Sequence, residues 1–191
     1  MTIAVATLPD ALRLGAVHLA VADADRAQAF YQDALGLQVH GREERVRGAG
    51  PGAARVTDAG VRLQGAADHG VSEALYLADP DGNGLELYVD RPRENWPAGS
   101  GGSRVGMFTA PLDLRALPET VRGQERRPRS GTGLVVGHVH LHVGDLARAL
   151  AFYRDALGLE RMTSLPGAEF LAAGGYHHHL AVSMRPSRWR G

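Results

Sequence analysis

The sequence predicts an α+β fold in which one structural unit occurs twice. Three observations support this prediction. Residues 15–38 recur as residues 137–160 without a gap, and about two thirds of the aligned positions are identical. Each copy carries a strand pattern followed by a helix pattern. Further strand patterns, separated by turn residues, follow each copy.

The first copy begins with a strand pattern and continues as a helix. Apolar side chains alternate with small or polar ones over residues 17–21, which predicts a half-buried strand. Asp23 occupies a helix N-cap position, the apolar spacing extends to Leu35, and Gly36 suits the left-handed residue that ends a helix. The second copy repeats the cap, the aromatic pair, the leucine and the glycine at Asp145, Phe152, Tyr153, Leu157 and Gly158.

The stretch after the first copy predicts a short helical piece and three strands. The helical piece is expected at residues 53–59 and a first strand at residues 61–64. Residues 73–78 and 85–90 have strand patterns, and the Asp-Pro-Asp-Gly-Asn-Gly sequence of residues 79–84 is a turn by composition. The last two strands are therefore expected to form a hairpin.

The region between the copies has the composition of a connection. Residues 91–133 are rich in Pro, Gly and Arg and have little periodicity. In the second copy's unit, strands are expected at 169–173 and 176–183. The predicted organisation is a first module at 12–97, an interdomain linker at 98–133 and a second module at 134–191.

The composition limits the partners and metal ligands that we expect for this protein. The 191 residues carry a formal net charge of zero, which predicts no binding to nucleic acid and none to a membrane surface. Cysteine is absent, so a bound metal would be held by imidazole and carboxylate groups. The first residues show no signal-peptide pattern, and we expect a cytoplasmic protein.

Two candidate metal ligands come from strand patterns. His18 faces away from the apolar side chains of residues 17–21, and Glu86 projects from the polar face of residues 85–90. Together they supply two parts of a His/His/carboxylate triad, which is a ligand set for Fe(II). Taken singly, His18 is better explained as a partly exposed strand histidine than as a ligand, and Glu86 is better explained as a solvated carboxylate.

Other histidines are weaker candidates. His140 aligns with His18 and shares a strand face with His142, which allows a ligand role in the second copy. His40 and His138 are expected at surface or turn positions.

A run of three histidines lies within the last strand pattern. His177 and His179 are expected on one face of that strand and His178 on the other. A polar strand that lines a cleft explains this run better than metal binding does, and both explanations stay open.

A longer match points to a family. Residues 68–86, DHGVSEALYLADPDGNGLE, resemble the signature segment of extradiol ring-cleavage dioxygenases. The matching elements are His69, Leu75-Tyr76, Asp-Pro-Asp-Gly at 79–82, and Glu86. The repeat resembles the first βαβββ unit of vicinal-oxygen-chelate modules. Residues 174–182, GGYHHHLAV, resemble the second module of Bacillus-type catechol 2,3-dioxygenases.

The resemblance implies a fold of paired βαβββ units and a site. It implies His18 and Glu86 as ligands of Fe(II), with Mn(II) as the alternative metal, and a catechol-like aromatic substrate that reacts with dioxygen. His69 matches the histidine that transfers protons, and Tyr76 matches the tyrosine that hydrogen-bonds a substrate oxygen. An oxidoreductase of aromatic compound catabolism is therefore expected.

The chain also departs from the family pattern. The strand that carries the second histidine ligand is missing, and no histidine occurs over residues 41–68. Both modules are shorter than the resemblance requires, so a third ligand is sought among His140, His177 and His179. A metal-free binding module and a glyoxalase-like lyase are the alternative functions. Missing strands leave sheet edges to be covered, and we expect either a homo-oligomer or pairing of the two partial modules.

Overall fold

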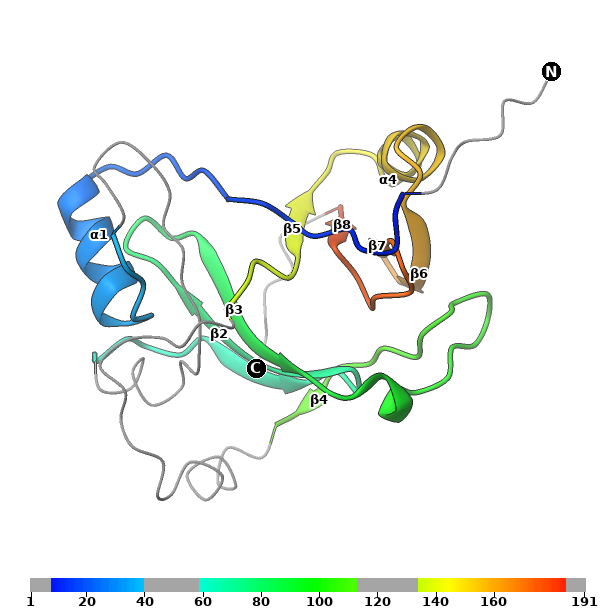
Figure 1. Ribbon diagram of the computed structural model, residues 1–191, viewed down its shortest axis with the longest axis horizontal. Coiled ribbons are helices and arrows are strands. Elements are labelled where there is room, and N and C mark those ends of the chain that lie inside the picture. Colours follow the sequence, from blue (N-terminus) through cyan, green and yellow to red (C-terminus); the bar gives the residue numbers. More distant parts are fainter. Residues whose placement is uncertain (1–7, 40–58, 113–133, 185–191) are drawn as a thin grey trace. The chain divides into compact units, whose positions relative to one another are not determined.

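A computed structural model describes residues 8–39, 59–112 and 134–184 (Figure 1). These residues form two compact units. The copy-1 unit takes its described residues from Ala16–Asp90 and Thr109–Val135. The copy-2 unit takes them from Met1–Gly15, Arg91–Phe108 and Val136–Arg188. The predicted α+β class is confirmed. In the described ranges, no helix is long and apolar enough to cross a membrane.

The helix of the copy-1 unit, α1, spans Ala24–Asp33 and has the predicted ends. Asp23 is extended (φ −142°), and its carboxylate accepts a hydrogen bond from the backbone N–H of Arg26 at 3.0 Å. Gly36 is left-handed (φ 68°), as expected of the residue that follows a helix. Leu35 is buried beside Leu77, so the apolar face predicted for this helix packs on the sheet.

The predicted strand over residues 17–21 is wrong. This segment has no regular structure, and Val17 and Leu19 remain 51% and 42% exposed. A strand exists only through the ladder that it shares with a neighbour, and the alternating pattern alone does not supply one. In the twin segment, β5 (Val139–His142), the same pattern pairs with a neighbouring strand and folds as predicted.

The copy-1 sheet contains four strands. They are β1 (Gly65–Asp68), β2 (Ser72–Ala78), β3 (Gly84–Asp90) and β4 (Ala110–Pro111), in the order β3-β2-β1-β4. Every pairing is antiparallel, and β2 and β3 confirm the predicted hairpin.

The strand predicted at residues 61–64 is misplaced, since β1 begins at Gly65. The tight β1–β2 turn sets the register and therefore the extent of β1: Gly70 is left-handed there (φ 77°), and Asp68 accepts from its N–H at 2.8 Å. The helical piece expected at 53–59 lies outside the described residues, apart from Ala59, which is in a turn.

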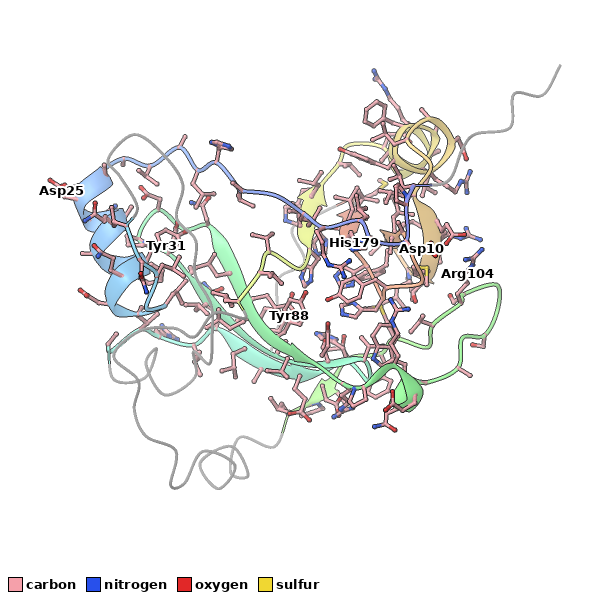
Figure 2. The ribbon with its side chains drawn as sticks, viewed as in Figure 1. Asp10, Asp25, Tyr31, Tyr88, Arg104 and His179 are labelled. Carbon is pink, nitrogen blue, oxygen red and sulfur yellow. The ribbon has the colours of Figure 1, made fainter. Side chains whose placement is uncertain are left out.

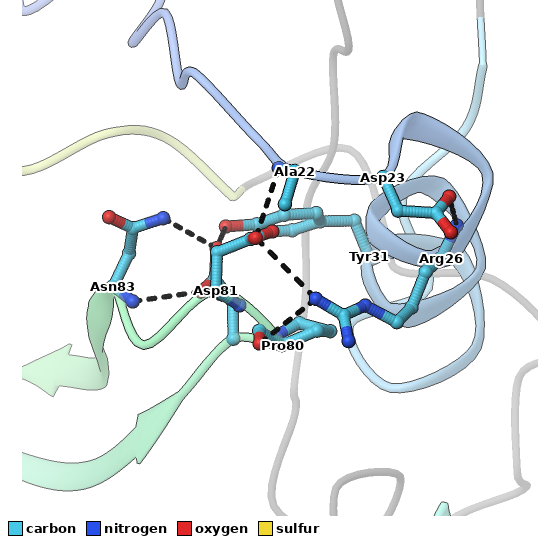
Figure 3. Close-up of polar contacts among 8 residues, drawn as sticks. Ala22, Asp23, Arg26, Tyr31, Pro80, Asp81 and Asn83 are labelled. Atoms are coloured by element: carbon cyan, nitrogen blue, oxygen red, sulfur yellow. Dashed lines mark hydrogen bonds and ion pairs between the residues drawn. The ribbon is translucent and has the colours of Figure 1, made fainter.

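The turn between β2 and β3 is held by one buried carboxylate. Asp79 accepts hydrogen bonds from the backbone N–H groups of Asp81 (3.0 Å) and Asn83 (2.8 Å). It also accepts from the Asn83 side chain (2.9 Å) and from the Tyr31 hydroxyl on α1 (2.8 Å), so the hairpin is tied to the helix (Figure 3). Burial acts to raise the pKa of Asp79, but these hydrogen bonds outweigh it and hold the pKa below 3.8.

The copy-2 unit contains a complete βαβββ succession. It runs β5, α4 (Leu146–Leu150, extended by a π-helical turn at Ala151–Ala156), β6 (Glu160–Leu165), β7 (Ala168–Ala172) and β8 (Leu180–Ser183). The strand order is β5-β8-β7-β6, and β5 runs parallel to β8. Asp145 caps α4 by accepting from the N–H of Arg148, as its twin does in α1.

The strand predicted at residues 176–183 is too long, because β8 begins at Leu180. Gly174 and Gly175 are both left-handed (φ 59° and 65°), and the chain after them turns instead of extending. The three histidines therefore lie in the loop before β8, where each is buried (His179 is labelled in Figure 2). The expectation that they alternate across a strand is also wrong.

Segments far from the second repeat complete the copy-2 unit. Leu8 and Leu12 pack against the core of Leu171 and Val182, and both of those core side chains are fully buried. A Cβ atom at Gly174 would lie 2.3 Å from the backbone oxygen of Asp10, so the N-terminal segment passes very close to this loop.

Residues 91–108 also belong to this unit. The Trp96 ring packs against Tyr176 and His177, and the Thr163 hydroxyl donates to the carbonyl of Val105 at 2.6 Å. The short helix η1 (Arg93–Asn95) precedes Trp96.

Candidate active site

Three of the predicted site residues meet in the copy-1 sheet. Tyr76 on β2 and Glu86 on β3 are register partners, so their side chains lie on the same face of the sheet. His69 lies in the turn between β1 and β2, seven residues before Tyr76. His69 and Tyr76 are 9% and 5% exposed, so the hairpin geometry buries the imidazole and the phenol together.

These side chains form one hydrogen-bonded chain. The Tyr76 hydroxyl donates to Glu86 Oε1 at 3.0 Å, and His69 Nε2 lies 2.5 Å from the same hydroxyl. At the other end, the Thr109 hydroxyl lies 3.3 Å from His69 Nδ1. The chain therefore links an exposed threonine to a carboxylate through two buried rings.

The surroundings of Tyr76 in this hydrogen-bonded chain keep its hydroxyl protonated. Burial raises the pKa of the Tyr76 hydroxyl well above its usual value of 10, and the charge of Glu86 and the hydrogen bond to it raise it further. A phenolate in this position would be desolvated and would face a carboxylate. Tyr76 therefore stays protonated and donates its hydrogen bond to Glu86.

His18, the expected first ligand, is not brought to this chain. It lies on the exposed, irregular segment that precedes α1. Among the residues that the structure describes, no three His, Cys, Asp or Glu side chains form a group able to hold a metal ion. Of the predicted copy-1 residues, the fold thus gathers His69, Tyr76 and Glu86, and leaves His18 apart.

In the copy-2 unit, His140 and His142 lie on the same face of β5, as expected. His140 Nε2 and His142 Nδ1 lie 3.0 and 3.1 Å from the Ser183 hydroxyl on β8. Both rings are thus held by one serine across the parallel pair of strands.

The buried histidine run packs against other rings. His177 Nδ1 lies 2.8 Å from His178 Nδ1, so one of the two nitrogens must be unprotonated and accept from the other. The backbone N–H of Ala173 donates to His179 Nδ1 at 3.3 Å. Burial, followed by the positive charge of Arg13, lowers the pKa of His179.

Two further histidines were expected at surface or turn positions. His138 is partly buried, and its ring stacks on that of His178, with 4.2 Å between the ring centroids. His40 lies outside the described residues.

Thr109 is the site residue that the sequence did not indicate. It precedes β4, which pairs with β1 over two residues only. A two-residue strand within a Pro- and Gly-rich stretch has no periodicity by which it could be recognised. The only available signal was the weak apolar pattern at residues 107–114, which gives no strand partner.

Comparison with known proteins identifies the family. Residues 135–188 match the model of the Glyoxalase/Bleomycin resistance protein/Dioxygenase superfamily, and residues 13–45 match that of the Bleomycin resistance protein-like N-terminal family. The chain belongs to this superfamily. The two matched regions contain the two copies of the repeat, so the internal duplication is a duplication of a superfamily unit.

One curated protein shares much of the sequence. The chain is 45% identical over 140 residues to a protein named Catechol-2,3-dioxygenase from Bacillus subtilis (strain 168). The match takes in 72% of this chain and 47% of the relative, so the chain spans about half the length of the protein that it matches.

Two solved structures align with most of this chain. Glyoxalase I from Zea mays superposes on 85% of this chain with a TM-score of 0.46 and 17% identity, and 63% of that chain is covered. A proposed dioxygenase from Bacillus subtilis subsp. subtilis str. 168 superposes on 86% with a TM-score of 0.49 and 12% identity, and 61% of it is covered.

Proposed function

We propose that the chain is an extradiol ring-cleaving dioxygenase of the catechol 2,3-dioxygenase type, acting on a catechol-like aromatic diol and dioxygen. The observation that carries the proposal is the hydrogen-bonded chain that joins buried His69 and buried Tyr76 to half-buried Glu86. The identity to a relative named Catechol-2,3-dioxygenase supports the same reaction class.

His69 is proposed to transfer protons. Cleavage of a catechol begins with the loss of a hydroxyl proton and ends with protons returned to the product, so a group that both accepts and donates is required. Imidazole does this near neutral pH because its ordinary pKa is close to 6.5. The buried position of His69 keeps competing water away from the transfer.

Tyr76 is proposed to orient the substrate. Its single hydroxyl proton is donated to Glu86 in the structure, so it is not available to a substrate oxygen in this arrangement. Substrate orientation by Tyr76 therefore requires Glu86 to release the hydroxyl. A carboxylate engaged by a metal ion would do so.

Fe(II), with Mn(II) as the alternative, is the cofactor proposed from the family. The described residues alone do not fit a complete site, because only Glu86 of the two proposed ligands lies in the hydrogen-bonded chain. The twin segment offers a way to bring the other ligand in. β5 pairs in parallel with the last strand of its unit, and the same pairing of residues 17–21 along β3 would bring His18 beside the strand that carries Glu86.

An anaerobic Fe(II) titration followed by oxygen uptake with catechol tests the proposal. We expect one iron per chain, oxygen consumption and a yellow ring-fission product. His18→Ala and Glu86→Ala should each abolish iron binding and turnover, while Asp155→Ala, an exposed carboxylate on the π-helical turn, should change neither. A folded protein that neither binds iron nor consumes oxygen contradicts the proposal.

A metal-free binding module is the second candidate. It is favoured by one observation, the exposed and irregular segment that carries His18. Calorimetric titration with catechol in the presence of a chelator separates the two candidates. Binding that persists without metal and without turnover supports the module, whereas binding that depends on Fe(II) supports the enzyme.

A further inference from the structure

Thr109 is placed opposite His69 by the backbone. β4 pairs with β1 so that Ala110 faces Asp68, and one more step along the same antiparallel register sets Thr109 against His69. The hydroxyl of Thr109 lies 3.3 Å from Nδ1 of the imidazole. Thr109 itself is exposed, whereas His69 is buried, so this contact connects the buried imidazole to a side chain that reaches solvent.

The carboxylate at one end of this hydrogen-bonded chain fixes the direction of every hydrogen bond in it. A carboxylate only accepts, so Tyr76 donates its one proton to Glu86. The Tyr76 oxygen must then accept from His69, which requires a proton on Nε2. A neutral imidazole with its proton on Nε2 has a bare Nδ1, and the Thr109 hydroxyl is the group that donates to it.

We infer that Thr109 is a positioning residue that holds His69 in the Nε2–H tautomer. The donors then point one way, from Thr109 through His69 and Tyr76 to Glu86. His69 in this state accepts a proton at Nδ1, on the side of Thr109. The role of this tautomer in catalysis rests on the proposed function. The assignment of the tautomer rests on the hydrogen bonds alone.

The ring nitrogens of His69 report the tautomer directly. We expect a long-range ¹H–¹⁵N spectrum at pH 8 to show a protonated Nε2 and an unprotonated, hydrogen-bonded Nδ1 for this ring, assigned by its loss in His69→Gln. In Thr109→Val, which keeps the shape of the side chain and removes the hydroxyl, the Nδ1 signal should shift to that of a nitrogen without a donor. Thr109→Ser should restore the wild-type signal.

Two outcomes would overturn the inference. One is a wild-type His69 that carries its proton on Nδ1, and the other is a Thr109→Val spectrum that matches the wild type. Because Thr109 is exposed, the valine variant should fold, and the wild-type measurement decides the tautomer even if it does not. Ser164→Ala is the control: it removes an exposed hydroxyl in the copy-2 unit and should leave the His69 signals unchanged.

Turnover separates this inference from the proposed function. In iron-loaded protein, Thr109→Val should lower kcat about three- to tenfold with little change in KM, as for one lost hydrogen bond, and Thr109→Ser should recover it. The expected spectra without turnover in any variant would refute the proposed function and leave the tautomer assignment standing. Turnover equal in wild type and Thr109→Val, with a shifted Nδ1 signal, would refute the catalytic part of the inference.

Discussion

At the scale of single residues, Asp79 shows how much a loop can depend on one side chain. Its carboxylate satisfies donors from the turn and from α1, and it is 5% exposed. The Asp-Pro-x-Gly composition predicted a turn, but it did not predict the contact with Tyr31. That contact joins residues 48 positions apart, and sequence composition contains no information on such a distance.

Removing this carboxylate should cost stability in a pH-dependent way. The pKa of Asp79 is lowered in the folded state, so the stabilisation is present above the usual value of 3.8 and is lost as the pH falls through the lowered value. We expect Asp79→Ala to lower the free energy of unfolding by about 2 kcal/mol or more at pH 7 and by less at pH 3. Urea denaturation at both pH values measures this. Asp155→Ala should show a smaller difference between the two pH values, because its ion pair with Arg154 is exposed to solvent. An equal loss for Asp79→Ala at both pH values would contradict the assignment.

At the scale of elements, the helix signals were the most reliable part of the sequence. Both N-cap aspartates and both left-handed glycines occur where the pattern placed them, because caps act within a few residues of the chain. The prediction of a strand over residues 17–21 was wrong because a strand needs a hydrogen-bonded neighbour, and its own sequence does not specify one. The candidate site was predicted where it depends on a hairpin, at Tyr76 and Glu86, and was missed at Thr109.

The two caps provide a matched pair of variants. Asp23→Ala and Asp145→Ala each remove the acceptor for one N–H in a helix's first turn. Each should lower the free energy of unfolding by about 0.5–2 kcal/mol, as measured by chemical denaturation. Asp25→Ala, in the same first turn as Asp23 but not its cap, should cost less. A cost for Asp25→Ala equal to that for Asp23→Ala would mean that the charge and not the cap is stabilising.

Neighbouring glycines separate backbone strain from steric contact. Gly174 and Gly175 are both left-handed, but only at Gly174 would a Cβ atom meet backbone, at 2.3 Å from the oxygen of Asp10. Gly175→Ala should lower the free energy of unfolding by about 1–2 kcal/mol, the usual cost of a left-handed backbone for a residue with a Cβ atom. Gly174→Ala should cost clearly more, by differential scanning calorimetry. Equal costs would mean that the N-terminal segment moves aside freely.

At the scale of the whole molecule, an exposed edge strand of the copy-1 sheet offers a surface for self-association. β3 is the end strand of the copy-1 sheet and carries Val89, which is 72% exposed. An apolar edge strand favours association with another chain. We expect concentration-dependent self-association by analytical ultracentrifugation and a lower-order species for Val89→Lys, because a charged edge opposes pairing. Arg62→Lys, an exposed and charge-conserving change, should leave the distribution as it is. A wild-type protein that is monomeric at all concentrations would contradict this expectation.

The copy-2 unit takes residues from both ends of the chain and from its middle. Leu8 and Leu12 pack against a core that includes Leu171 and Val182, which lie far along the sequence from them. The apolar side chains of Leu8 and Leu12 therefore have these partners only once the strands that carry Leu171 and Val182 are present. Contacts of such long sequence separation slow folding. We expect the copy-1 hairpin to form first and the copy-2 unit to fold only when β8 has joined its sheet.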